Sequence, residues 1–316
     1  MTRVLIHLGL PKTATTSIQH NVFQKLHDQG KIHFLGKNLD YRDKAGKVVI
    51  HNYTGKFIRD AVEEKISLVD GRELLLKHLD STKLNVFSDE GIMIAYPGQV
   101  NLPLKKKIEN LKKVLEGYDV NVVLTLRNPV DYFYSLYVQL YPDFYSQIKE
   151  LNTFEKYTQK LLSDVDNILF ESFFYDAYLP LLNEKFDFEL TYFEDLGQDK
   201  VSAYQIWAKV LNVGFYEFKS LFEQEHLNKK QKTGKGTKKL FSFKFIETAV
   251  RNLLVDMPLA FKIVKKVYIF FNMRMLLNKR ITFNAVHNKP VGPHLDTLSK
   301  LFKVNCYDHR KCNVKP

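Results

Sequence analysis

The chain has 316 residues, of which 45% are hydrophobic and 26% charged, a composition typical of globular proteins. No stretch approaches the ~20 consecutive apolar residues that cross a bilayer, and the amino-terminal apolar run is too short for a signal peptide. The two cysteines, Cys306 and Cys312, do not make a disulfide framework, which indicates a reducing compartment. We therefore expect a cytoplasmic protein with a full apolar core.

The formal net charge of +12 is concentrated in the carboxyl-terminal part of the chain. Residues 228–316 hold 20 Lys and Arg against 4 Asp and Glu, whereas residues 1–227 hold 27 against 31. Such a basic segment either attracts acidic glycans, anionic lipid surfaces or other anionic polymers, or forms a solvated face. A non-catalytic nucleic-acid-binding protein is one alternative, but the chain has no recognised reader motif, and we expect no nucleic acid as a partner.

Short apolar runs and amphipathic segments alternate along the first two thirds of the chain. The runs predict strands at 3–8, 84–88, 120–126 and 188–193. The amphipathic segments predict helices at 15–28, 102–115, 129–140, 154–162, 174–183 and 201–211. This alternation favours an α/β domain, with a central parallel β-sheet flanked by helices and right-handed crossovers.

A change of composition near residue 228 predicts the end of this domain. The stretch NKKQKTGKGTKK (228–239) has no apolar residue and predicts an exposed loop. We expect an α/β domain at 1–228 and a basic, mainly helical extension at 229–316 that packs on the domain or continues it. Its segments 240–254 and 257–280 mix apolar and basic residues, which suits a core helix, a membrane-surface helix or a self-association helix. The chain after residue 290 is predicted to be irregular.

The stretch GLPKTATTS (9–17) lies between the first strand and the first helix. A strand-to-helix loop presents unpaired N–H groups with the positive end of the helix dipole behind them, which is a site for phosphate. The alternative is a capped helix start, with Thr13 or Thr15 as the N-cap. The Walker A pattern is absent, because Gly9 precedes Lys12 by three residues and no glycine adjoins the lysine.

A second strand-to-helix turn follows the strand at 120–126. Arg127 ends that strand, Pro129 suits the first position of a helix, and Ser135 lies on the helix. A guanidinium group and a hydroxyl group together suit a terminal phosphate dianion.

The motifs at residues 11–19 and 127–135 resemble those of sulfotransferases that use 3′-phosphoadenosine 5′-phosphosulfate (PAPS). PKTATTSIQ (11–19) is similar to the family's 5′-phosphosulfate loop, P-K-[TS]-G-T-T-[ST], with Ala14 where glycine is usual. A positive φ at Ala14 would be strained. Arg127, followed eight residues later by Ser135, resembles the family's 3′-phosphate motif. The resemblance implies a P-loop-like three-layer fold, PAPS as donor, the 3′,5′-bisphosphate PAP as product, and no metal.

The resemblance also implies roles for individual residues. The 5′-phosphate would be held by the loop residues Lys12, Thr13, Ala14, Thr15, Thr16 and Ser17, and the 3′-phosphate by Arg127 and Ser135. Lys12 would also neutralise the oxygen that bridges phosphorus and sulfur. In KLNVFSDEGIM (83–93), Glu90 would be the catalytic base, with Asp89 as its rival. Either carboxylate could instead cap the next helix.

Three histidines and a second acidic pair complete the candidates for the site. His7, His20 and His33 lack the context of a histidine base, and His7 is predicted to be a packed strand residue. In LTYFEDLG (190–197), Glu194 and Asp195 are predicted to be mainly structural.

The expected reaction is sulfuryl transfer from PAPS to a hydroxyl or amine acceptor, with a carbohydrate or glycolipid favoured. The aromatic run YFYSLYVQLYPDFY (132–145) could stack on sugars or pack the helix. The basic carboxyl-terminal segment could reach an acidic glycan or the inner membrane surface, where the protein would be peripheral. The rival enzyme class is a nucleoside or sugar kinase with a divergent phosphate loop.

Overall fold

The computed structural model describes residues 1–42, 47–141, 143–198, 201–223 and 293–303. The chain divides into two compact units, one of residues 1–229 with 289–316 and one of residues 230–288. The second unit lies outside the described residues, as do the predicted loop at 228–239 and the predicted helices at 240–254 and 257–280. The predicted domain boundary at residue 228 therefore stays a prediction.

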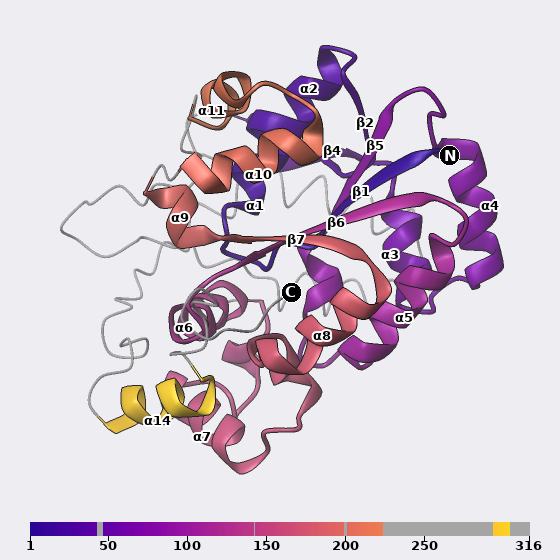
Figure 1. The fold of residues 1–316 in the computed structure, drawn as a ribbon. Coiled ribbons are helices and arrows are strands. Elements are labelled where there is room, and N and C mark those ends of the chain that lie inside the picture. Colours follow the sequence, from indigo (N-terminus) through magenta and orange to yellow (C-terminus); the bar gives the residue numbers. More distant parts are fainter. Residues whose placement is uncertain (43–46, 142, 199–200, 224–292, 304–316) are drawn as a thin grey trace, which may run out of the picture. The chain divides into compact units, whose positions relative to one another are not determined.

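A five-stranded parallel sheet forms the centre of the first unit, in the order β2–β5–β1–β6–β7 (Figure 1). Its strands are β1 (Arg3–His7), β2 (Ile32–Phe34), β5 (Leu84–Ser88), β6 (Asp119–Leu126) and β7 (Asp187–Tyr192). The earlier strands β2 and β5 lie on one side of β1, and the later strands β6 and β7 lie on the other. Such a switch in strand order opens a crevice at the carboxyl ends of the central strands. The four predicted strands and the predicted parallel sheet are confirmed.

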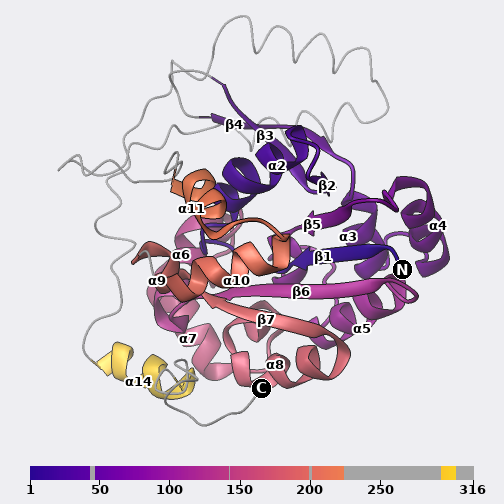
Figure 2. The ribbon, with the colours of Figure 1, turned by 45° about the horizontal axis from the view of Figure 1, so that its top comes forward.

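Side chains of the sheet alternate between two apolar cores, because successive residues of a strand point to opposite faces. Leu5 packs in one core, whereas Val4 and Ile6 pack in the other. The Leu5 face is covered by the helix that spans residues 15–28, by α10 (Val201–Leu211) and by α11 (Phe215–Glu223). The opposite face is covered by α3 (Lys56–Val62), α4 (Leu68–His78), α5 (Leu104–Val114), α6 (Pro129–Leu140) and α8 (Tyr175–Lys185). Figure 2 shows these helices on the two sides of the sheet, which confirms the three-layer prediction.

The first helix is continuous over the predicted range but changes its winding. It comprises α1 (Thr15–Ser17), a π-helical segment at Ile18–Gln24 and α2 (Lys25–Asp28). Ile18, Val22 and Leu26, the predicted apolar face, are all fully buried. A π-helical segment inside an α-helix frequently accompanies a functional site, and this one begins three residues after the Lys12 loop enters the helix.

Some elements were not predicted. β3 (Lys37–Arg42) and β4 (Lys47–Tyr53) form an antiparallel hairpin in which Lys37 lies opposite Tyr53. The short helix α9 (Phe193–Gly197) follows β7 directly. Short 3₁₀ segments occupy Glu90–Met93, Tyr145–Gln147 and Ile168–Phe173.

An aromatic core surrounds α6, α7 (Phe154–Ser163) and α14 (Pro293–Leu301). Tyr132, Phe133, Tyr137 and Tyr145 are at most 1% exposed, so these four rings of the aromatic run pack the core and are not available to stack on sugars. The prediction of an irregular chain after residue 290 is wrong, because α14 packs on α6. Two apolar residues anchor it there: Leu298 is fully buried, and the ring of Phe302 lies 5.6 Å from that of Phe133.

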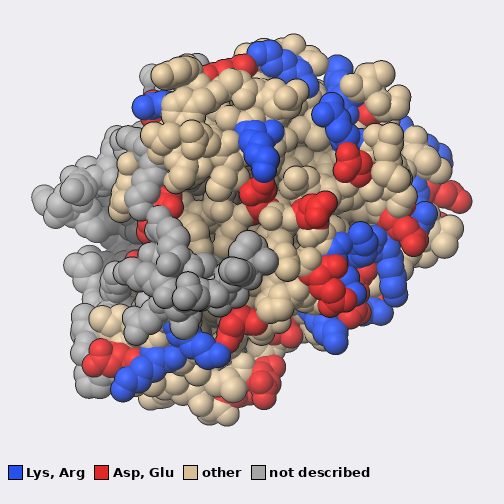
Figure 3. Space-filling view, in the orientation of Figure 1, with Lys and Arg blue, Asp and Glu red and all other residues tan. Residues whose placement is uncertain are grey.

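The described surface carries both signs of charge. Figure 3 shows Lys and Arg interspersed with Asp and Glu over the visible described face, without a large region of one sign. Many of these charges form ion pairs, such as that of Lys209 with Glu189 at 2.6 Å. Among the described residues, no helix is both long and apolar enough to cross a membrane.

Candidate active site

The loop that leaves β1 is held beside β6 and turns sharply at Lys12. The Leu8 and Leu10 amides donate to the carbonyls of Val123 and Thr125, at 2.9 and 3.4 Å. Thr13 then donates its hydroxyl to the Leu10 carbonyl at 2.6 Å, which closes the turn. Lys12 adopts a φ of 68°. Lys12 therefore lies in the left-handed α region, which residues other than glycine adopt only rarely.

Gly9 and Ala14 show two different demands on small residues in this loop. A Cβ atom at Gly9 would lie 2.4 Å from Nε2 of His7, so the glycine is needed for close packing. Ala14 has a φ of 64° and a ψ of 14°, the left-handed conformation that was expected to be strained in alanine. The backbone therefore keeps the shape that a glycine would favour, although this chain has alanine there.

The helix behind the loop begins without a side-chain cap. Ala14 is the N-cap residue, and the first helical hydrogen bond runs from the Ile18 amide to the Ala14 carbonyl at 3.0 Å. The alternative of Thr13 or Thr15 as N-cap is therefore wrong. The amides of Thr15, Thr16 and Ser17 occupy the first turn, where a helix offers no carbonyl partner. This end of the helix can receive an anion, and Lys12, three residues before the helix begins, is exposed.

The end of β6 brings the two predicted phosphate motifs together. Nη1 of Arg127 donates to the Ser135 hydroxyl at 3.2 Å and to the Lys12 carbonyl at 3.1 Å. The guanidinium carbon lies 4.8 Å from the centre of the Phe193 ring, at the start of α9. Stacking on a ring holds the planar guanidinium in a fixed orientation. Sequence reasoning missed Phe193, although it lies in the quoted segment 190–197.

The turn after Arg127 is fixed by polar contacts on both sides. The Asn128 side chain accepts from the amides of Val130 and Asp131 and so caps α6. The backbone N–H of Asn128 donates to the Glu194 carboxylate at 2.9 Å, in agreement with the structural role that was predicted for Glu194. The Tyr175 hydroxyl donates to the Arg127 carbonyl at 2.7 Å. Arg127 therefore projects from a rigid turn.

The end of β5 separates the two candidate bases. Asp89 is fully buried and accepts from Tyr53, Lys37, Arg59 and the Gly91 amide. Burial raises the pKa of Asp89, but the Lys37 and Arg59 cations and the hydrogen bonds outweigh it, so the pKa lies below its ordinary value. A carboxylate with four donors has no vacant side for a substrate proton. Asp89 is thus a structural anchor.

Glu90 differs from Asp89 in exposure and in its partners. Its side chain is 22% exposed, against 0% for Asp89. One oxygen lies 3.5 Å from Nζ of Lys37, and the other accepts from Nε2 of Gln19 at 3.4 Å. Burial lowers the pKa of Lys37, but the Glu90 and Asp89 carboxylates raise it more, so it lies above its ordinary value. Of the two carboxylates, Glu90 is the one that a substrate can reach.

His7 is a packed strand residue, as predicted. It is fully buried among aromatic rings, with Trp207 at 5.0 Å and Phe23 at 5.7 Å between ring centres. Burial lowers its pKa to about 3. Its Nδ1 atom lies 2.8 Å from the Ser88 hydroxyl, whereas Nε2 has no hydrogen-bond partner among the described residues.

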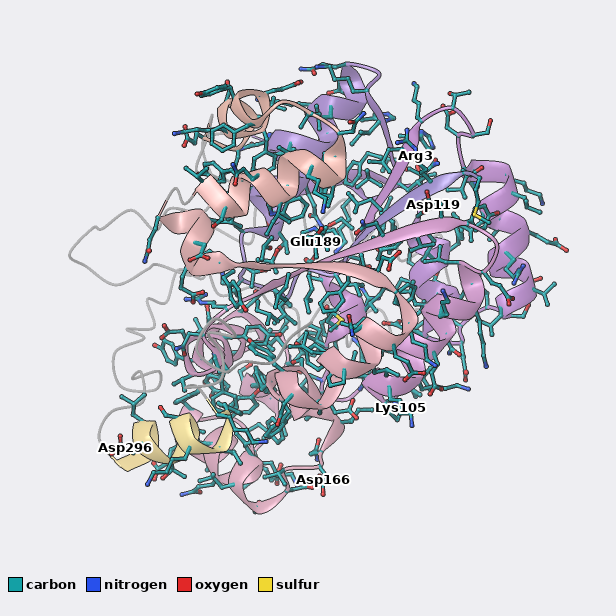
Figure 4. The ribbon with its side chains drawn as sticks, in the orientation of Figure 1. Arg3, Lys105, Asp119, Asp166, Glu189 and Asp296 are labelled. Atoms are coloured by element: carbon teal, nitrogen blue, oxygen red, sulfur yellow. The ribbon has the colours of Figure 1, made fainter. Side chains whose placement is uncertain are left out.

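A separate cavity lies at the amino-terminal ends of the strands, away from the predicted site. This cavity of about 340 Å³ is lined by Arg3, Lys31, Lys83, Thr82, Asn212 and four apolar or glycine residues. Figure 4 labels Arg3 and Asp119 at the starts of β1 and β6, the edge away from the Lys12 loop. The predicted site residues lie at the carboxyl ends of the strands, so this cavity is not part of their site.

Comparisons with known proteins return sulfotransferases among the solved structures. A sulfotransferase from Alicyclobacillus acidocaldarius matches with a TM-score of 0.44 and 16% identity, over 68% of this chain and 83% of that one. A mouse sulfotransferase in complex with PAP matches with a TM-score of 0.38 and 13% identity, over 70% of this chain and 63% of that one. No protein-family model matches the sequence, and a search of curated proteins finds no match.

Proposed function

We propose that this protein transfers a sulfuryl group from PAPS to a hydroxyl or amine acceptor. The observation that carries the proposal is the pair of hydrogen bonds from Arg127 to the Lys12 carbonyl and to Ser135. The first bond joins the predicted 5′-phosphate loop to the predicted 3′-phosphate motif, 115 residues later in the sequence, and the second orders the latter motif. A nucleotide with phosphates at both positions would meet both motifs.

The donor would be held by the loop and by the end of β6. The amides of residues 13–16 and the hydroxyls of Thr15, Thr16 and Ser17 would bind the 5′-phosphate, because they lie at a helix start with positive potential. Arg127 would bind the 3′-phosphate with Ser135, since a guanidinium fork matches phosphate oxygens. The resident groups fit such a donor without a metal ion, and the absence of a metal stays a prediction.

The chemical step would be an in-line displacement at sulfur. The acceptor oxygen forms a bond to sulfur while the bond from sulfur to the bridging phosphate oxygen breaks, which leaves PAP. Lys12 would neutralise the negative charge that develops on that bridging oxygen. Glu90 would take the proton of the acceptor hydroxyl. Catalysis would thus consist of positioning and electrostatic stabilisation, as in phosphoryl transfer.

The acceptor class that we propose to screen first is a carbohydrate or glycolipid hydroxyl. A carboxylate base suits a sugar hydroxyl. The half-buried ring of Tyr96, which lies beside Arg59 near the end of β5, would offer a face for a sugar to stack on. The basic segment 228–316 would attract an acidic glycan or the inner membrane surface. A cytoplasmic location, peripheral at that membrane, belongs to the same proposal.

Calorimetric titration of the purified full-length protein with PAP, AMP and ATP–Mg²⁺ tests the donor site. Sulfotransferase function predicts micromolar binding of PAP that depends on the 3′-phosphate and needs no metal. Binding of ATP–Mg²⁺ in place of PAP would instead identify a kinase-like site. Steeply salt-dependent binding of DNA or RNA, without PAP binding, would favour the nucleic-acid alternative.

Two substitutions refine this test. Arg127→Ala is expected to weaken PAP binding about 10- to 100-fold, the value of a hydrogen bond to a charged group, and to affect AMP far less. Arg72→Ala is the matched control, since Arg72 forms an exposed ion pair with Glu116 at 2.7 Å elsewhere on the surface. Equal losses for PAP and AMP in Arg127→Ala would remove its role at the 3′-phosphate.

A further inference from the structure

Gln19 links the donor loop to the candidate base. It lies at the start of the π-helical segment behind the Lys12 loop and is only 2% exposed. Its amide nitrogen reaches across to the end of β5. There it lies 2.9 Å from the Ser88 hydroxyl oxygen, 3.4 Å from the Ser88 carbonyl and 3.4 Å from Oε2 of Glu90. Gln19 is the last residue of PKTATTSIQ (11–19), but no role was predicted for it.

The partners of Gln19 fix the orientation of its amide. The Ser88 carbonyl and the Glu90 carboxylate only accept hydrogen bonds, so the NH₂ end of the amide must face them. The two hydrogens of this NH₂ group serve Ser88 on one side and Glu90 on the other. The Ser88 hydroxyl oxygen therefore accepts from Gln19, and its own hydrogen is left for another acceptor.

His7 is that acceptor in the tautomer that has no proton on Nδ1, and it is the buried end of the hydrogen-bond series. Its Nδ1 atom lies 2.8 Å from the Ser88 hydroxyl. When Ser88 donates, Nδ1 carries no proton and the neutral ring holds its proton on Nε2; in the other tautomer Nδ1 donates to the second lone pair of Ser88. In the first tautomer, hydrogen bonds run in one direction, from Gln19 to Ser88 to His7. A neutral histidine suits this position, where the ring is packed between Trp207 and Phe23.

We propose that Gln19 is a positioning residue that holds Glu90 in place to deprotonate the acceptor, anchored through Ser88 to the buried His7. This inference rests on the proposed function. Gln19 holds one oxygen of Glu90, and Lys37 holds the other at 3.5 Å. The carboxylate is thereby fixed relative to the helix whose first turn would bind the donor phosphate. A displaced base is costly, since a shift of about 1 Å can lower a rate about 100-fold.

The experiment compares Gln19→Leu, Gln19→Glu and Glu90→Gln with the wild-type protein. PAP binding is measured by calorimetry. Turnover is measured as PAP released from PAPS, both with water as acceptor and with a mixture of neutral and acidic oligosaccharides. Asn21→Leu is the matched control, because Asn21 is also a buried amide of this helix, with a hydrogen bond of 3.4 Å to the Phe222 carbonyl.

We expect Gln19→Leu to keep the PAP affinity within about threefold and to lower kcat about 10- to 100-fold, with little change in KM for PAPS. Combined with Glu90→Gln, it should add almost nothing, since both act on the same proton transfer. In Gln19→Glu, turnover should recover as the pH falls, because only the protonated carboxyl group can donate to Glu90. Asn21→Leu should keep kcat.

Several outcomes overturn the inference. If Gln19→Leu keeps kcat, or if its loss adds fully to that of Glu90→Gln, Gln19 does not position Glu90. If PAP binding weakens as much as turnover, Gln19 supports the donor loop instead. If the wild type neither binds PAP nor releases it from PAPS, the proposed function fails, and this inference with it.

Discussion

The left-handed backbone at Ala14 predicts that Ala14→Gly does not destabilise the protein. The conformation at a φ of 64° costs an alanine about 1–2 kcal/mol. The glycine variant loses about 0.4–1 kcal/mol of stability, because glycine has more conformational freedom in the unfolded chain. Loss of the half-buried methyl group costs about 0.4 kcal/mol, half the value of a fully buried one. Central values leave about 0.4 kcal/mol in favour of glycine.

The matched control is Ala177→Gly, the same chemical change at an exposed position of α8. There the residue is helical, and glycine is expected to cost about 1 kcal/mol. Urea unfolding should therefore place Ala14→Gly about 1.4 kcal/mol above Ala177→Gly in the free energy of unfolding. If both variants lose the same stability, the left-handed conformation at Ala14 is not a source of strain and the reasoning is refuted.

Three further perturbations test the site. Arg127→Lys keeps the charge but not the planar fork, so calorimetry should show PAP binding weakened about tenfold or more, and unchanged affinity would contradict the fork. Asp89→Asn removes the buried partner of Lys37 and Arg59, and urea unfolding should show a loss of about 3–5 kcal/mol; a loss below 1 kcal/mol would speak against the anchor. The pKa of His7 is lowered to about 3 in the folded state, so between pH 6.5 and 3 only the unfolded state binds a proton there. The free energy of unfolding should therefore fall by about 1.4 kcal/mol for each unit that the pH is lowered through this range. His7→Asn should flatten this slope, and an unchanged slope would assign it to other groups.

Most of the longer periodic segments were predictable from sequence, although α4 and α11, with 11 and 9 residues, were not. The strand at Leu84–Ser88 and the helix at Pro129–Leu140 have the predicted bounds, because each is a clean apolar run or a capped amphipathic segment. β2 has only three residues, too few for a period to appear. The π-helical segment was missed because its residues keep an ordinary helical apolar pattern.

The candidate site was predicted from motifs that resemble those of a known family, and some of its contacts could not be predicted that way. The motifs after β1, β5 and β6 lie at one edge because these strands are parallel neighbours in the sheet. The partners of Asp89 were missed, since Tyr53 and Arg59 belong to β4 and α3, which no sequence pattern predicted. Gln19 was missed because a glutamine on an apolar helix face has no distinctive pattern, and only its distances reveal its partners.

The docking of α14 changes how the chain can be shortened. Leu298 and Phe302 come from the last 25 residues but fill the core around α6. A protein that stops near residue 228 would lose both side chains and uncover the parts of the Phe133 and Phe173 rings that Phe302 contacts. Such a truncation would aggregate through its exposed rings, and a lost activity would say nothing about the basic segment. Replacing residues 230–288 with a flexible linker would keep Leu298 and Phe302 in the aromatic core. Any change in activity of that variant could then be assigned to the removed residues.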